Sequence, residues 1–170
     1  MEIHAMFRKV DKEEPINTFL RKKKHIVYGA RAMNQQLPLH LQRPTDDYDV
    51  YSKTPKKSAR NMEKHLDKHY GGDYYYVKPA LHPGTYKVVD RGQDKKPNTE
   101  DDYPVVDYTK PTRKIRHIER KGIRYARLSE RRKDIKKSLA DKESAYRHEK
   151  DKRDMQRIKN KSIIMNFIRR

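Results

Sequence analysis

The chain contains no cysteine, which excludes disulfide bonds and thiolate metal sites and removes the usual signal for a redox compartment. It has no apolar run long enough to cross a bilayer, and its first residues form no apolar signal segment. Neither an internal repeat nor a low-complexity tract is present, and the eight histidines lack metal-ligand spacing. We therefore expect no membrane contact, and we assign the histidines no role.

Apolar residues are also scarce, at 33% of the 170 residues against 39% that are charged. This composition allows one domain with a modest core and a further segment with little core of its own. Residues 111–170 hold 22 Lys/Arg and 8 Asp/Glu, so they carry +14 of the net charge of +19. Such a basic region predicts a polyanionic partner, with nucleic acid the natural one; a solvated helix face without any partner is the alternative.

Helix and strand patterns alternate through residues 1–110. Helices are predicted over 16–24, 30–37 and 54–70, and strands over 25–28, 48–51, 74–77, 85–90 and 104–108. From residue 111 the pattern is helical, and it ends with a helix over 144–167. Between an α/β and an α+β core we favour α+β: a mixed sheet flanked by helices over residues 1–110, followed by a basic helical extension over 111–170.

Three strand carboxylates stand out. Asp47 and Asp49 are two residues apart, so on a strand their side chains leave the same face and repel each other. A divalent cation, Mg2+, is the usual reason to tolerate such a pair, although an Asp-x-Asp can also simply face solvent. Asp107 is the preferred third carboxylate because its flanks are more apolar than those of the competing Asp90. Three carboxylates at one sheet edge would hold Mg2+ beside the α-phosphorus of a nucleoside triphosphate.

A glycine turn precedes these strands. Gly29 separates a strand from a helix that begins at Ala30, and the free backbone N–H groups of such a helix can hold phosphate oxygens, with Arg31 assisting. One glycine at such a turn is ordinary. The turn becomes informative because of its place in an order of elements: a strand, the turn, a helix, the Asp-x-Asp strand and a later strand with a single Asp.

That order resembles the nucleotidyltransferase superfamily of DNA polymerase β, and more narrowly the small nucleotidyltransferase-like proteins of large DNA viruses and some phages. The resemblance covers about residues 16–110, and its motifs are Val27-Tyr-Gly-Ala-Arg31, Thr45-Asp-Asp-Tyr-Asp-Val-Tyr51 and Val105-Val-Asp-Tyr108. It departs from the family pattern at Ala30, where members carry Gly or Ser.

The resemblance implies Mg2+-dependent transfer of a nucleoside monophosphate from a nucleoside triphosphate to a hydroxyl of a nucleic acid or protein. It makes Asp47, Asp49 and Asp107 the catalytic and metal-binding residues, and it places Gly29-Ala30 under the triphosphate. The lack of a membrane-spanning run and of a signal segment predicts a location in the cytoplasm, which would be the host cytoplasm or the virion if the protein is viral.

The basic C-terminal region offers further candidates. In this superfamily, helices after the core supply basic residues to the triphosphate or to a nucleic-acid backbone, which makes Lys150 and then Arg147 the nucleotide-binding candidates. Ion pairs within the helix, such as Glu143 with Arg147, are the alternative. The apolar tail 163–168 either docks on the core or binds a virion or other protein partner.

Two other hypotheses stay open. The first is a non-catalytic nucleic-acid-binding or virion-associated structural protein on the same fold, suggested by Ala30 and by the charge of +19. The second is a ribosome-like, basic RNA-binding protein unrelated to this fold, for which Asp47 and Asp107 would lie far apart.

Overall fold

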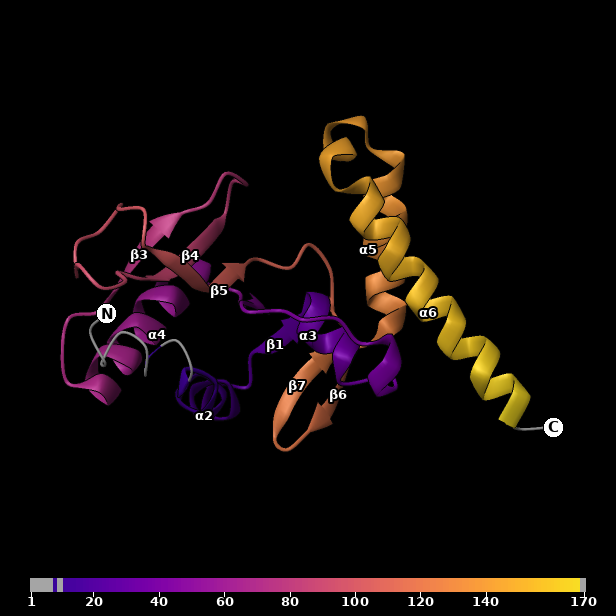
Figure 1. The fold of residues 1–170 in the computed structure, drawn as a ribbon, viewed down its shortest axis with the longest axis horizontal. Coiled ribbons are helices and arrows are strands. Elements are labelled where there is room, and N and C mark those ends of the chain that lie inside the picture. The colour runs from indigo at the N-terminus through magenta and orange to yellow at the C-terminus, as the bar shows by residue number, and fades with distance from the viewer. Residues whose placement is uncertain (1–7, 9–10, 169–170) are drawn as a thin grey trace.

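The structure, a computed structural model, describes residue 8 and residues 11–168, and it places a mixed seven-stranded sheet between helices (Figure 1). The sheet has the order β3-β4-β5-β2-β1-β7-β6. The strands are β1 Ile26–Tyr28, β2 Tyr48–Tyr51, β3 Tyr75–Pro79, β4 Thr85–Asp90, β5 Tyr103–Thr109, β6 His117–Arg120 and β7 Ile123–Ala126. The helices are α2 Glu13–Lys23, α3 Gly29–Asn34, α4 Pro55–Tyr70, α5 Leu128–Ala140 and α6 His148–Ile168, with 3-10 turns η1 Leu39–Leu41 and η2 Lys142–Arg147. The predicted α+β class is confirmed.

The centre of the sheet sets the register on which the site depends. β2 pairs in parallel with β5, which places Asp49 opposite Asp107. β1 runs antiparallel to β2 and places Tyr28 opposite Asp49. β4 runs antiparallel to β5 and places Lys87 opposite Asp107. Four separate strands thus bring Tyr28, Asp49, Asp107 and Lys87 onto one line across the sheet.

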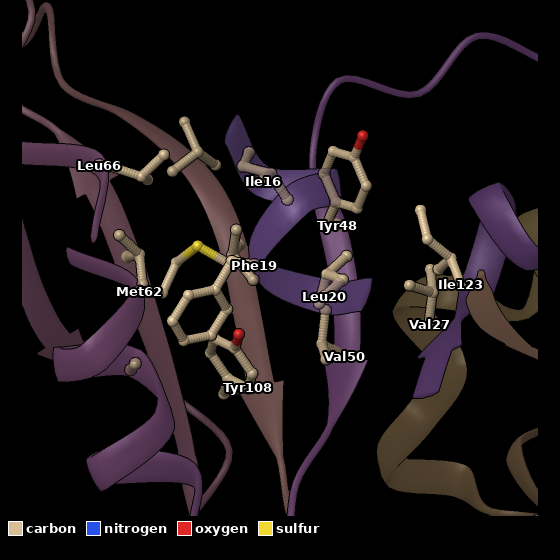
Figure 2. Packing of buried hydrophobic residues seen from close by; sticks show 14 of the residues in the cluster. Ile16, Phe19, Leu20, Val27, Tyr48, Val50, Met62, Leu66, Tyr108 and Ile123 are labelled. Carbon is tan, nitrogen blue, oxygen red and sulfur yellow. The ribbon is translucent and has the colours of Figure 1, made fainter. Parts of the chain in front are cut away.

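Alternation along the strands separates a core face from a polar face. Tyr48 and Val50 of β2 are buried against α2 and α4, while Asp49 between them points to the opposite face. Apolar side chains spaced three and four apart supply the helical half of this core (Figure 2). They are Ile16, Phe19 and Leu20 from α2 and Ala59, Met62 and Leu66 from α4.

The expectation of continuous helix after residue 110 is wrong over residues 117–126. These residues form the hairpin β6–β7, and β7 joins the sheet in parallel beside β1. Its turn is Lys121-Gly122, both with positive φ (49° and 76°), which is the geometry that a two-residue hairpin requires. Ile123 and Tyr125 pack into the main core, a period-2 pattern that the surrounding charges hide in the sequence. The helical part therefore begins at Leu128, while the division into domains at residue 110 stays a prediction.

The two long C-terminal helices lie side by side (Figure 1). A second small core, built from Met33, Leu37, Ile135 and Ile158, joins them to α3. Lys150, in the first turn of α6, lines the same hollow as Gly29 and Asp49, so the start of α6 lies over the polar face of the sheet. Within the described residues no helix combines the length and apolarity that a bilayer span needs.

Candidate active site

A cleft of about 440 Å³ opens on the polar face of the sheet. Its floor comes from the middle strands and the β1–α3 turn, and its walls from the β3–β4 hairpin and the C-terminal helices. The chemically relevant lining residues are Tyr28, Gly29, Ala30, Asp49, Lys87, Asp107, Arg131, Arg147 and Lys150. Of the residues predicted from the sequence, the cleft therefore collects Asp49, Asp107, Gly29, Ala30, Arg147 and Lys150.

Asp49 is the carboxylate most disturbed by its surroundings. Burial, followed by the negative charges of Asp47 and Asp107, raises its pKa from 3.8 to about 6, while the cations Lys150 and Arg131 oppose the rise. Carboxylates that raise one another's pKa in this way lie close together without enough positive charge between them. This electrostatic deficit is the property that a divalent cation would correct.

The two carboxylate oxygens of Asp107 have different surroundings. Oδ2 accepts a hydrogen bond of 2.7 Å from the ammonium of Lys87. Oδ1 is buried and has no hydrogen-bond partner in the part of the chain that the structure describes. Burial raises the pKa of Asp107, and Lys87 works against that rise. Lys87 was not predicted from the sequence, because only the β4–β5 register shows that it faces Asp107.

Asp47 lies immediately before β2 and is not among the residues that line the cleft. Its Oδ1 accepts a 3.3 Å hydrogen bond from the Thr45 hydroxyl. It is nevertheless near enough for its charge to raise the pKa of both Asp49 and Asp107. The structure thus pairs Asp49 with Asp107 directly and leaves Asp47 at the margin.

Gly29 is required by both conformation and space. Its φ is +65°, a region that L-residues rarely adopt, and a Cβ at this position would overlap Asp49 Oδ2. The carboxylate therefore packs directly on the backbone of the turn. Ala30 follows, 4% exposed, and gives the cleft a methyl group in place of a hydroxyl.

Arg31 points away from the cleft. Its guanidinium lies 3.7 Å from the Tyr48 ring centroid, and its Nε donates a 2.8 Å hydrogen bond to the Asp47 carbonyl. Its Nη1 forms a 2.8 Å ion pair with Glu13. These contacts fix the segment before β2 to α2 and α3, so Arg31 positions the Asp-x-Asp strand and lines a separate hollow.

The cationic wall is held by two buried carboxylates of α6, Asp151 and Asp154, both fully buried. Arg131 Nη2 contacts Asp151 Oδ1 at 2.9 Å and Asp154 Oδ2 at 2.8 Å. Arg147 pairs with Asp151 at 3.1 Å, so the predicted intrahelical pairing exists with a different acid than Glu143. Lys150 is exposed and forms no ion pair within the described residues. Arg131, which was not among the candidates predicted from the sequence, is brought into the cleft by the packing of α5 on α6.

The donor set fits a divalent cation. Asp49 and Asp107 present carboxylate oxygens from adjacent strand positions, and Asp107 Oδ1 has an unused lone pair. Among residues 8 and 11–168, no three His, Asp or Glu side chains form a ready-made metal cluster. The metal therefore belongs to the proposal below.

The comparisons with known proteins bear on the fold. The crystal structure of the Megavirus polyadenylate synthase superposes on this chain with a TM-score of 0.73, covering 92% of it at 23% sequence identity. This chain spans only 32% of that protein, about a third of its length. No model of a known protein family matches the chain. No curated protein matches it either. The chain therefore shares the fold of that polyadenylate synthase over most of its length, in agreement with the predicted mixed sheet flanked by helices.

Proposed function

We propose that the protein is a nucleotidyltransferase that uses Mg2+ to transfer a nucleoside monophosphate from a nucleoside triphosphate to a hydroxyl of a nucleic acid or protein. The observation that most strongly supports this proposal is the pairing of Asp49 with Asp107 on adjacent strands. The pair lies at the foot of a cleft whose opposite wall is cationic. The similarity in fold to a viral polyadenylate synthase supports the same class of reaction.

In this proposal Asp49 and Asp107 hold the metal, and Asp47 contributes charge from the margin or moves in as a third ligand. The metal would supply Lewis-acid polarisation of the phosphate oxygens. Arg131 and Lys150 would neutralise the triphosphate, and the Gly29-Ala30 backbone would lie beneath it. Arg147 would strengthen the same wall.

The transfer step needs one base. The acceptor oxygen forms a bond to the α-phosphorus while the bond from that phosphorus to the bridging oxygen breaks, and pyrophosphate leaves with the electron pair. Asp107 Oδ1, buried and without a partner among the described residues, would accept the hydroxyl proton with the second of its two lone pairs, the first being directed to the metal. Lys87, hydrogen-bonded to the other oxygen, would favour the ionised form of Asp107, which is the form that accepts a proton.

The test is label transfer. The protein is incubated with Mg2+, RNA or a protein acceptor, and each α-32P-labelled nucleoside triphosphate in turn. We expect incorporation that falls at least a hundredfold in Asp49→Asn and in Asp107→Asn. The matched control is Asp46→Asn, an exposed neighbour in the same segment. Absence of incorporation with every nucleotide, or incorporation that survives both substitutions, would remove the enzymatic proposal.

A non-catalytic, nucleic-acid-binding role on the same fold is the second candidate. Two observations favour it: Ala30 lacks the hydroxyl of the family pattern, and the Lys87 ammonium already neutralises part of Asp107. It predicts salt-dependent RNA or DNA binding that is indifferent to Asp49→Asn and Asp107→Asn, together with no incorporation of label.

A further inference from the structure

A second hollow, of about 490 Å³, lies outside the cleft between the first half of α4 and the ends of β4 and β5. We call it the α4 groove. Five cations and one tyrosine give it its chemistry: Lys56, Lys57, Arg60, Lys64, Lys110 and Tyr86. No Asp or Glu is among the described residues that line it. This site was not predicted from the sequence, because residues 1–110 carry little of the net charge.

The cations of the α4 groove are not used to hold the fold together. None of the five forms an ion pair within the described residues, and all five are exposed. Lys56, Arg60 and Lys64 are four residues apart, so they form a row about 12 Å long on one side of the helix. By contrast, Arg113 and Arg116 of the C-terminal region pair with buried Glu130. Free cations in a row are the arrangement that a phosphate backbone binds.

Tyr86 indicates that the bound phosphate backbone belongs to a single-stranded nucleic acid rather than to a duplex. Its ring is partly exposed at the floor of the groove, and the Lys56 ammonium lies 5.9 Å from the ring centroid. A ring beside phosphate-binding cations can stack on an unpaired base, which a duplex does not offer. The positive charge of the groove would also attract an acidic protein, but an acidic protein has no bases to stack on the Tyr86 ring.

The α4 groove and the cleft lie on opposite faces of the sheet, on either side of the start of β4 and the end of β5. Tyr86 lines the groove, whereas Thr85 and Lys87 on either side of it line the cleft. Similarly, Thr109 lines the cleft and the adjacent Lys110 lines the groove. A strand held in the groove would therefore have to turn only around the β4 and β5 ends to reach the carboxylates.

We propose that the α4 groove binds the backbone of single-stranded nucleic acid, and that this strand is the acceptor whose end enters the cleft. The binding itself is independent of the chemistry; only the role as acceptor rests on the proposed function.

The test compares two charge reversals of equal size. Arg60→Glu with Lys64→Glu changes the α4 groove, and Lys136→Glu with Lys137→Glu changes an exposed cluster of α5 by the same four charges. Binding of a fluorescein-labelled 20-nucleotide single strand is measured by anisotropy across a salt series. We expect the α4 variant to weaken binding about tenfold or more and to lower the salt slope by about 1.4, the value for two lost phosphate contacts. The α5 variant should change binding less than about threefold.

Equal losses in the two variants, a larger loss in the α5 variant, or tighter binding of a duplex of the same length would overturn the groove assignment. A second measurement uses a photoreactive oligonucleotide carrying 5-bromouridine, whose crosslink we expect at Tyr86; a crosslink confined to residues 128–168 would contradict the proposal. Wild-type protein that binds the strand through the α4 groove but transfers no label would refute the catalytic proposal alone. Label transfer that is the same in the wild-type protein and in the α4 variant would refute only the role of the groove strand as acceptor.

Discussion

Replacing Asp49 by asparagine should stabilise the folded protein at neutral pH, although it removes a proposed metal ligand. Burial and the charges of Asp47 and Asp107 raise the pKa of Asp49 from 3.8 to about 6. Two pKa units correspond to about 3 kcal/mol of unfavourable free energy for the ionised form. Because the carboxyl is only partly shielded from water, we expect a gain of about 1–2 kcal/mol in the free energy of unfolding.

The pH dependence gives the sign of the effect. A carboxyl whose pKa is raised by folding favours the folded state fully below its unfolded value of 3.8, and that contribution is lost as the pH rises through about 6. Asp49→Asn should therefore change stability little at about pH 4 and by the full amount at about pH 7.5.

Urea denaturation in EDTA, at both pH values, measures this difference directly. In a matched buffer without EDTA, Mg2+ should raise the stability of the wild-type protein and leave Asp49→Asn unaffected, since the metal supplies the missing positive charge. A variant that is less stable at neutral pH, or equally shifted at both pH values, would refute the reasoning about the paired carboxylates.

Three further substitutions probe the surroundings of the site. Lys87→Met should tighten Mg2+ binding about tenfold, measured by calorimetry, because a competing cation is removed; weaker binding would mean that Lys87 organises the site. Gly29→Ala should abolish label transfer and lower the melting temperature more than Gly71→Ala does. Both glycines have a positive φ, but only Gly29 has a neighbouring side chain where the Cβ would lie. Equal melting temperatures of the two variants would contradict the packing argument. Asp154→Ala should lower the free energy of unfolding by about 3–5 kcal/mol, because Arg43 and Arg157 lose their ion pair and Arg131 keeps only its contact with Asp151. The exposed control Glu149→Ala should have little effect.

Much of the fold was predictable because its strands are short apolar runs bounded by glycine or proline. Those signals place β1, β2, β4 and β5 within about one or two residues. The β6–β7 hairpin escaped prediction because it is dense in charge, and its strand character shows only in alternate residues that pack once β1 is beside them. The periodicity of a basic segment does not show that its residues will pair with β1 in the folded protein.

The residues of the candidate site that lie in short local motifs were predictable from the sequence. Spacing and order identified Asp49, Asp107 and Gly29, which the structure brings together. Lys87 and Arg131 depend on strand register and helix packing, which are properties of the whole fold. The α4 groove is a further example, because its cations gain meaning only when Tyr86 is placed beside them.

The central claim is that Asp49 and Asp107 share a divalent cation that carries a nucleoside triphosphate. The most direct measurement is electron paramagnetic resonance of Mn2+, titrated into the protein with a non-hydrolysable nucleoside triphosphate analogue. The account predicts a protein-bound Mn2+ signal in the wild-type protein that disappears in the Asp49→Asn, Asp107→Asn double variant and persists in Asp46→Asn. Binding of Mn2+ with unchanged affinity in the double variant, or none in the wild-type protein, would contradict it.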